Sequence, residues 1–168
     1  SVRKKLRRLN TKLDQIQDLG GCRAVLRSIA DANKLFEFYQ TASKHLLHKS
    51  TNYIAHPKYG GYRSYHLMLR YRGNGRDEVY DGRRVELQIR TRLQHSWATA
   101  VEAVGLFRRE DIKGGEGDPD WLRLFDLMSS ELAMAEDCQE AEHLPGHQER
   151  VSEIIDLNRK LNALEVLE

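Results

Sequence analysis

The pattern of apolar and polar positions divides the first half of the chain into short strands and one long helix. Residues 19–28 form an apolar-rich run that predicts a strand, and Asp31 is expected to cap the helix that follows. Alternating positions predict two further strands, 63–72 and 84–90, and the Gly/Asn/Asp-rich stretch 73–82 between them indicates antiparallel neighbours. The apolar positions of the helix fall at helical spacing: Leu35, Phe38, Tyr39, Ala42 and Leu46.

Helical spacing dominates the second half of the chain. Thr91 and Gln94 have the spacing of a capping box, which predicts a helix that starts there and ends at Gly105. Asp118 and Pro119 suit the N-cap and first position of a second helix. Its apolar stripe is Trp121, Phe125, Met128, Leu132 and Ala135. A last helical stripe, expected to pack on this domain or on a second copy in a homo-oligomer, consists of Ile154, Leu157, Leu161 and Leu164.

The length and composition predict one globular domain. The chain has 168 residues, of which 40% are hydrophobic, enough for a single sizeable core. No apolar run approaches the roughly 20 residues that a membrane-spanning helix needs, so we expect a cytoplasmic protein without a membrane partner. Cys22 and Cys138 alone do not predict a disulfide framework.

The charge is distributed very unevenly along the chain. Residues 1–109 hold 22 Lys/Arg and 9 Asp/Glu, a net charge of +13, whereas residues 110–168 hold 5 and 16, a net charge of −11. A large positive excess in one part is typical either of phosphate binding or of a solvated basic face. We therefore interpret residues 1–109 as the part that carries a binding cleft and residues 110–168 as a helical part of the same domain.

The strand at 84–90 has two chemically distinct faces. Because side chains alternate along a strand, three apolar residues point one way and three polar residues the other. An exposed edge strand has the same pattern, but a helix follows at once, and the end of a strand before a helix often carries a functional site. The apolar residues are Val85, Leu87 and Ile89, and the polar residues are Glu86, Gln88 and Arg90.

The segment His56-Pro-Lys58-Tyr-Gly-Gly-Tyr62-Arg63-Ser-Tyr65-His66 combines cations, glycines and aromatic rings, a mixture that suits nucleotide binding. Tyr65 shares strand parity with apolar neighbours and is expected in the core, whereas His66 takes the opposite face. Tyr62, at the end of the loop, is the better candidate for stacking on a base.

Three motifs in this order resemble the RelA/SpoT family of alarmone synthetase domains. The first is Asp18-Leu-Gly-Gly-Cys-Arg23, the second is Lys58 with Gly-Tyr62-Arg-Ser-Tyr-His66, and the third is Glu86-Leu-Gln-Ile-Arg90-Thr. The resemblance covers roughly residues 1–105. It implies an α+β fold like that of nucleotidyltransferases, with a mixed β-sheet flanked by helices.

The resemblance also implies roles for individual residues. Asp18 and Glu86 would be the catalytic carboxylates that hold Mg²⁺. Tyr62 would stack on guanine. The other acceptor-nucleotide residues would be Lys58, Arg63 and His66, and the residues around ATP and the transferred phosphates would be Lys4, Lys5, Arg7, Arg23, Gln88 and Arg90.

The implied reaction is the transfer of pyrophosphate from ATP to the 3′-hydroxyl of GDP or GTP, which makes (p)ppGpp. Phosphoryl-type transfer needs a hard cation and positioned positive charges, and the two carboxylates and the arginines supply both. One alternative is pyrophosphorylation of the 3′ end of tRNA, because Arg70, Arg72, Arg76, Arg83 and Arg84 cluster around one hairpin and could follow an RNA backbone. Another is a catalytically silent domain that binds a nucleotide or a protein partner.

Overall fold

The computed structural model describes residues 20–58 and 60–167. Four strands form one mixed sheet in the order β1-β4-β3-β2, in which β1 is parallel to β4 and the other neighbours are antiparallel. The strands are β1 (Gly21–Leu26), β2 (Leu46–Asn52), β3 (Tyr65–Arg70) and β4 (Arg84–Thr91). The helices are α2 (Ile29–Thr41), α3 (Arg92–Arg108), α4 (Pro119–Ala135), α5 (His147–Leu161) and α6 (Ala163–Leu167), with 3₁₀ turns η2 (Gly75–Tyr80) and η3 (Ile112–Gly114).

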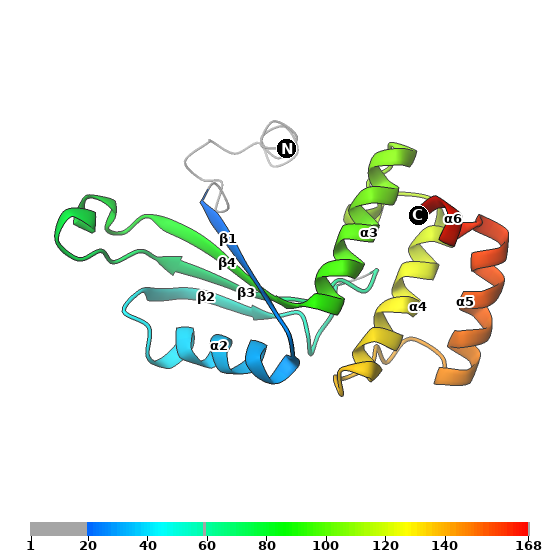
Figure 1. Ribbon diagram of the computed structural model, residues 1–168, viewed down its shortest axis with the longest axis horizontal. Helices are drawn as coiled ribbons and strands as arrows, with labels where there is room; N and C mark the ends of the chain where they lie inside the picture. The colour runs from blue at the N-terminus through cyan, green and yellow to red at the C-terminus, as the bar shows by residue number, and fades with distance from the viewer. Residues whose placement is uncertain (1–19, 59, 168) are drawn as a thin grey trace.

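Two apolar cores hold this architecture together. One lies between the sheet and α2 and is built from alternate residues of β3 and β4, among them Leu67 and Ile89, which have no exposed surface. The other lies among α3, α4 and α5, around Trp97, Trp121 and Phe125. The predicted α+β fold with a mixed sheet and flanking helices is therefore observed, with α2 on one face of the sheet and the other helices at one end (Figure 1).

The helix after β1 begins differently from the sequence prediction. Ser28, not Asp31, is its N-cap: the Ser28 hydroxyl accepts a hydrogen bond from the Asp31 backbone N–H at 3.1 Å. The helix also ends at Thr41, so Leu46, predicted as its last apolar position, instead opens β2. Sequence reasoning missed β2 altogether, because this edge strand is mostly exposed and polar and lacks apolar alternation.

The capping box at the start of α3 is confirmed, since the side chains of Thr91 and Gln94 each bond the other residue's backbone. The predicted end of α3 is wrong by three residues. Gly105 lies inside the helix, where the backbone of Glu110 passes so close that a Cβ would lie 3.0 Å from its carbonyl oxygen. The helix ends at Arg109, which adopts the left-handed conformation at φ 58°.

The predicted C-terminal stripe is split between two helices. Asn162, at φ 52°, ends α5 and separates it from α6. Ile154, Leu157 and Leu161 pack on the helical core, whereas Leu164 is 66% exposed. Three of the four stripe residues therefore pack within this domain. No helix in the described ranges combines the length and apolar character needed to span a membrane.

Candidate active site

The polar face of β4 forms the centre of the candidate site. The two predicted faces of the strand are confirmed, because Leu87 and Ile89 are buried beneath α2 while the polar residues occupy the other side. Gln88 Nε2 donates to Glu86 Oε2 at 3.2 Å, and Arg90 Nη2 donates to Gln88 Oε1 at 3.1 Å. One run of hydrogen bonds thus joins the three polar side chains along the strand.

Strand pairing adds two predicted residues to this face. His66 on β3 and Arg23 on β1 both lie directly opposite Gln88. His66 Nδ1 is 2.8 Å from Glu86 Oε1, and Arg23 Nη2 donates to Gln88 Oε1 at 3.4 Å. The Glu86 carboxylate therefore lies among side chains of β3 and β4, and Arg23 and Arg90 both donate to Gln88. The side chains of Glu86, Gln88 and His66 are half-buried.

Tyr62 closes the network on the side of the helices. Its hydroxyl lies 2.7 Å from His66 Nε2 and accepts a hydrogen bond from Arg90 Nη2 at 2.5 Å. The Arg90 guanidinium is also 4.9 Å from the centre of the Tyr62 ring. Only 8% of Tyr62 is exposed, since its ring belongs to the helical core. The proposed stacking of guanine on this ring would require its neighbours to move aside.

Tyr53, which sequence reasoning missed, provides a more accessible ring at the same place. It is half-buried, and the Lys58 ammonium lies 4.3 Å from its ring centre and 5.4 Å from that of Tyr62. Tyr53 also meets the edges of Tyr62 and His66 at ring-centre distances of 6.0 and 5.1 Å. The available signal was that Tyr53 directly follows a strand, but that strand, β2, was not predicted from the sequence.

Arg63 does not reach this network, contrary to the prediction that it binds the acceptor. It is 4% exposed, and its Nη1 donates to the carbonyl oxygens of Ile54 at 2.6 Å and Gln139 at 2.8 Å. Its Nε donates to Ser129 Oγ at 3.2 Å. Burial lowers the pKa of the Arg63 guanidinium, and the negative charges around it oppose that change only in part. Arg63 fastens the loop to α4 and to the segment after α4.

At the end of β4 and the start of α3, two buried nitrogen atoms have no hydrogen-bond partner among the described residues. One is Nε of Arg90, whose side chain is almost fully buried, and the other is Nδ1 of His95 in the first turns of α3. A buried donor without a partner costs about 1–3 kcal/mol, so such groups often mark ligand positions. Arg90 was predicted as a phosphate ligand, whereas His95 was not recognised.

Glu102 on α3 and Lys49 on β2 are two further charged residues that the sequence did not reveal. Burial raises the pKa of Glu102, but its hydrogen bond to Lys113 and the charges of Lys113, Arg23 and Arg90 outweigh burial and lower it overall. Glu102 therefore feels the two arginines of the polar face. Lys49 pairs with Met68 on β3, and Met68 pairs with Glu86 on β4. Lys49 therefore lies on the same face of the sheet as Glu86, two strands away.

Four predicted residues lie outside the described part of the chain: Lys4, Lys5, Arg7 and Asp18. The described part of the chain begins with two glycines next to β4. Gly21 pairs with Glu86, and the Glu86 backbone N–H donates to the Gly20 carbonyl oxygen at 2.9 Å. Gly20 and Gly21 therefore lie beside Glu86, and the role of Asp18 stays a prediction.

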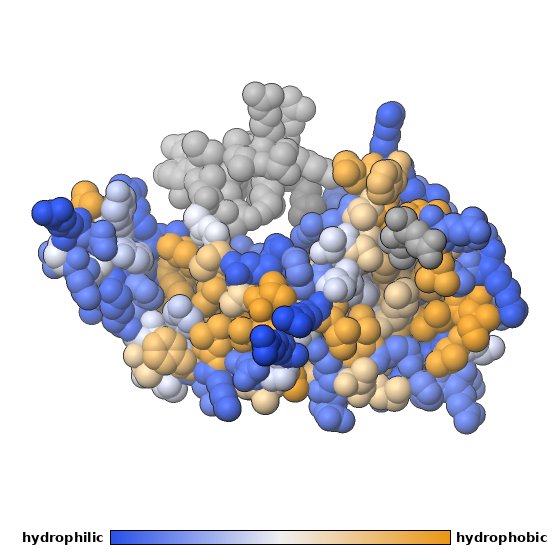
Figure 2. All heavy atoms as spheres, viewed as in Figure 1, coloured by the Kyte–Doolittle hydropathy of each residue, from blue (hydrophilic) through white to orange (hydrophobic). Residues whose placement is uncertain are grey.

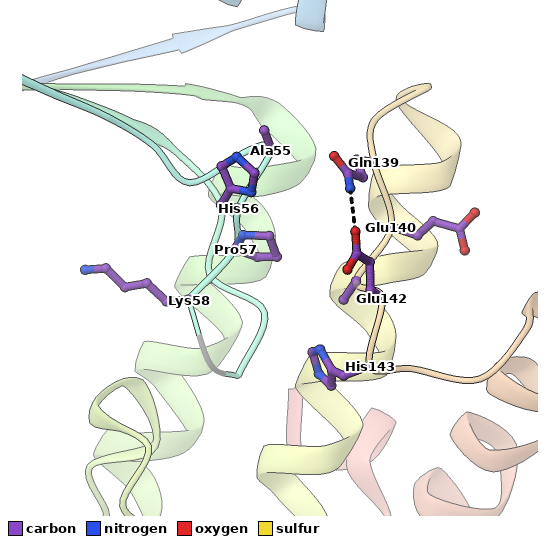
Figure 3. A pocket seen from close by; sticks show the side chains of 9 residues that line it. Ala55, His56, Pro57, Lys58, Gln139, Glu140, Glu142 and His143 are labelled. Atoms are coloured by element: carbon purple, nitrogen blue, oxygen red, sulfur yellow. Dashed lines mark hydrogen bonds between the residues drawn. The ribbon is translucent and has the colours of Figure 1, made fainter.

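A cavity of about 370 Å³ lies between the loop after β2 and the segment after α4. Figure 3 shows His56 and Pro57 on one wall and Gln139, Glu142 and His143 on the other. The Lys58 side chain points away from the second wall (Figure 3), consistent with its contact with the Tyr53 ring. The cavity is thus distinct from the polar face of the sheet.

Comparison with known proteins identifies the relatives of this chain. A family model described as "Region found in RelA / SpoT proteins" matches residues 1–110. The GTP pyrophosphokinase of Escherichia coli K12 is 30% identical over 139 residues, which are 79% of this chain and 18% of that protein. GTP pyrophosphokinase YjbM of Bacillus subtilis is 33% identical over 105 residues, 59% of this chain and 48% of that protein. The chain thus spans less than half the length of these relatives.

Solved structures show the same fold. The small alarmone synthetase 1 of Bacillus subtilis bound to its product pppGpp superposes with a TM-score of 0.67 at 23% identity, covering 81% of this chain and 69% of that one. A second structure of that synthetase gives a TM-score of 0.62 at 27% identity, covering 95% and 75%. The α+β fold with its mixed sheet is therefore that of small alarmone synthetases. Because the family model spans residues 1–110, most of the chain, the protein belongs to the RelA/SpoT family.

Proposed function

We propose that this chain transfers the β,γ-pyrophosphoryl group of ATP to the 3′-hydroxyl of GDP or GTP and so makes (p)ppGpp. The observation that carries the proposal is the position of Glu86: a carboxylate at the centre of a polar sheet face, linked through Gln88 to Arg23 and Arg90. The curated relatives named GTP pyrophosphokinase support the same reaction.

The two arginines suit the donor phosphates. Arg90 has a buried Nε without a partner among the described residues, and its Nη2 is already oriented by Tyr62 and Gln88. Arg23 is exposed at the open edge of the same row. Positioned guanidinium groups stabilise the charge that spreads over phosphoryl oxygens during transfer. Lys4, Lys5 and Arg7 stay predictions for additional ATP contacts.

The residues also fit a Mg²⁺ ion. Hard oxygen ligands suit this ion, Glu86 supplies one carboxylate on the polar face of β4, and Asp18 stays the predicted second ligand. Bound Mg²⁺ would neutralise charge on the phosphate oxygens. The remaining steps belong to the protein: Glu86 orients the acceptor hydroxyl and accepts its proton as the 3′ oxygen bonds to the β-phosphorus and AMP leaves.

The acceptor nucleotide would lie on the helix side of Glu86. His66 bridges the carboxylate and the Tyr62 hydroxyl, and Lys58 lies over the Tyr53 ring nearby. We assign the acceptor to these four residues and leave out Arg63, whose Nε and Nη1 donate to Ser129 and to two carbonyl oxygens of the protein. Residues 1–109 would then carry the chemistry, and residues 110–168 would hold the acceptor loop in place through α4.

A labelling assay tests the proposal. ATP labelled in its γ-phosphate, incubated with GDP, GTP or tRNA in the presence of Mg²⁺, should label the guanosine nucleotides, and EDTA should stop the reaction. Glu86→Gln should lower the rate about 10²–10⁴-fold, the usual contribution of a general base. Glu37→Gln, an exposed carboxylate on α2, is the matched control and should have no effect.

The alternatives give different results in the same assay. Label in tRNA and none in GDP or GTP would contradict the proposed acceptor. No transfer to any acceptor by the wild-type protein would indicate a domain that only binds. Full activity of Glu86→Gln would remove this carboxylate from the reaction.

A further inference from the structure

The hairpin that joins β3 to β4 carries an exposed basic cluster that the proposed reaction does not use. Its members, referred to below as the hairpin arginines, are Arg70, Arg72, Arg76, Arg83 and Arg84, and all five are exposed. In Figure 2 strongly hydrophilic residues cover this end of the sheet, remote from the helices.

The hairpin carries three carboxylates, Asp77, Glu78 and Asp81, against its five arginines. Asp81 Oδ1 accepts a hydrogen bond from the Gly73 backbone N–H at 2.6 Å, and Glu78 Oε1 accepts one from the Gly75 N–H at 3.2 Å. Both acids therefore stabilise the turn. Within residues 20–58 and 60–167, no ion pair or side-chain hydrogen bond of a hairpin arginine is found. Five arginines against three acids leave residues 70–84 with a net charge of +2, and none of the described residues forms an ion pair with the arginines.

Two of the hairpin arginines oppose each other directly. Arg70 and Arg84 are cross-strand partners in the β3–β4 ladder, and their side chains share the face that carries Glu86 two residues further along β4. Like charges at directly opposite positions destabilise a sheet. A bound anion would remove this repulsion. The pair of arginines therefore favours anion binding, although it opposes folding.

The tip of the hairpin adds apolar and aromatic surface to the charge. Val79 is 72% exposed and Tyr80 is 58% exposed. Exposed aromatic rings next to cations suit unpaired bases joined by phosphates, because a base stacks on the ring while the cations follow the backbone. An acidic protein segment would use the charge but would leave the Tyr80 ring without a matching group.

We propose that the hairpin arginines and Tyr80 form a docking surface for single-stranded nucleic acid. The phosphates lie on the arginines, and a base stacks on Tyr80. This surface goes beyond the proposed function, since its binding does not depend on which nucleotide accepts the pyrophosphate. It begins at Arg84, next to the reaction face, and extends to the tip of the hairpin.

The test measures binding of a fluorescently labelled 20-nucleotide oligouridine at several salt concentrations. The variant Arg72→Gln/Arg76→Gln/Arg83→Gln removes three charges distant from Glu86. Each phosphate contact on a single strand contributes about 0.7 to the slope of log affinity against log salt, so the slope should fall by about 2. Tyr80→Ala should weaken binding at least about fivefold at constant slope.

A matched control has the same loss of charge elsewhere: Lys34→Gln/Arg109→Gln/Arg159→Gln, three exposed residues on α2, after α3 and on α5. Its slope should equal that of the wild type, and pyrophosphate transfer to GDP by the hairpin variant should also be unchanged. Equal losses in both triple variants would overturn the proposal. The proposal would also be overturned if polyglutamate displaced the labelled oligouridine as effectively as unlabelled RNA does, or if the hairpin variant changed its oligomeric state.

Discussion

Substitution of Gly61 by alanine tests the connection between the acceptor loop and α4. Gly60 and Gly61 both have positive φ, at 84° and 87°, but their surroundings differ. A Cβ on Gly61 would lie 2.5 Å from Ser129 Cβ, whereas a Cβ on Gly60 would meet nothing within 4 Å. Gly60→Ala therefore isolates the backbone strain, and Gly61→Ala adds the collision with α4.

The structure sets the expected difference in the free energy of unfolding. Positive φ costs an alanine about 1–2 kcal/mol, and this cost is common to both variants. The loop of Gly61→Ala must also move off α4, which breaks the hydrogen bond from Ser129 Oγ to the Gly61 carbonyl oxygen (2.5 Å) and strains that from Arg63 to Ser129. At about 1 kcal/mol for each bond, Gly61→Ala should be about 2 kcal/mol less stable than Gly60→Ala.

Thermal unfolding followed by tryptophan fluorescence measures this difference, because Trp97 donates to the Phe125 carbonyl oxygen on the same stretch of α4. A loss of 2 kcal/mol corresponds to about 4–8 °C in a chain of this size. The KM for the acceptor should rise in Gly61→Ala as well, since Lys58 and Tyr62 lie on the displaced loop. Equal melting temperatures for the two variants would refute the reasoning that α4 fixes this loop.

Three further outcomes follow from the charges. Arg84→Gln should stabilise the protein by about 0.2–1 kcal/mol at low salt by removing the repulsion with Arg70, and the gain should vanish in 1 M salt, as melting temperatures at both salt concentrations will show. Arg63→Met should cost about 2–4 kcal/mol in urea unfolding, because the carbonyl groups that it binds lose a buried charged donor. Hydrogen bonds from Arg123 lower the pKa of Glu153 in the folded protein. The pair therefore stabilises the folded state fully when the pH is above the ordinary carboxyl pKa, and this stabilisation is lost as the pH falls through the lowered pKa of Glu153. Glu153→Gln should thus cost about 0.5 kcal/mol at pH 7, as expected for a half-exposed pair, and nothing near pH 2, in urea titrations at the two pH values.

Sequence patterns predicted the parts of the fold that depend on local alternation and capping. The faces of β4 and the start of α3 follow directly from Glu86–Arg90 and from the capping box of Thr91 and Gln94. The polar edge strand β2 could not be predicted, because its pairing with β3, rather than its own composition, makes it a strand. The helix caps at Ser28 and Arg109 depend in the same way on backbone geometry.

The candidate site could be predicted only as far as its residues lie on strands with clear parity. Glu86, Gln88, Arg90 and His66 were placed on one face correctly for that reason. Arg63 resembles the other basic residues in sequence, and only its burial against Ser129 and two carbonyl groups distinguishes it. Tyr53, Lys49 and Glu102 reach the site through tertiary contacts between segments that are distant in sequence, which a single sequence does not reveal.

The parallel pairing of β1 with β4 affects how an active molecule is made. Arg23 and Gln88, joined across these strands, are 65 residues apart, whereas β3 and β4 need only the intervening hairpin to meet. Closing the longer loop carries the greater entropy cost, so the hairpin can form early and β1 joins it late. The two ends of the reaction centre therefore meet only when the sheet is complete. Under the proposed function, a partly unfolded chain would therefore lack activity, and product would come only from molecules whose sheet is complete.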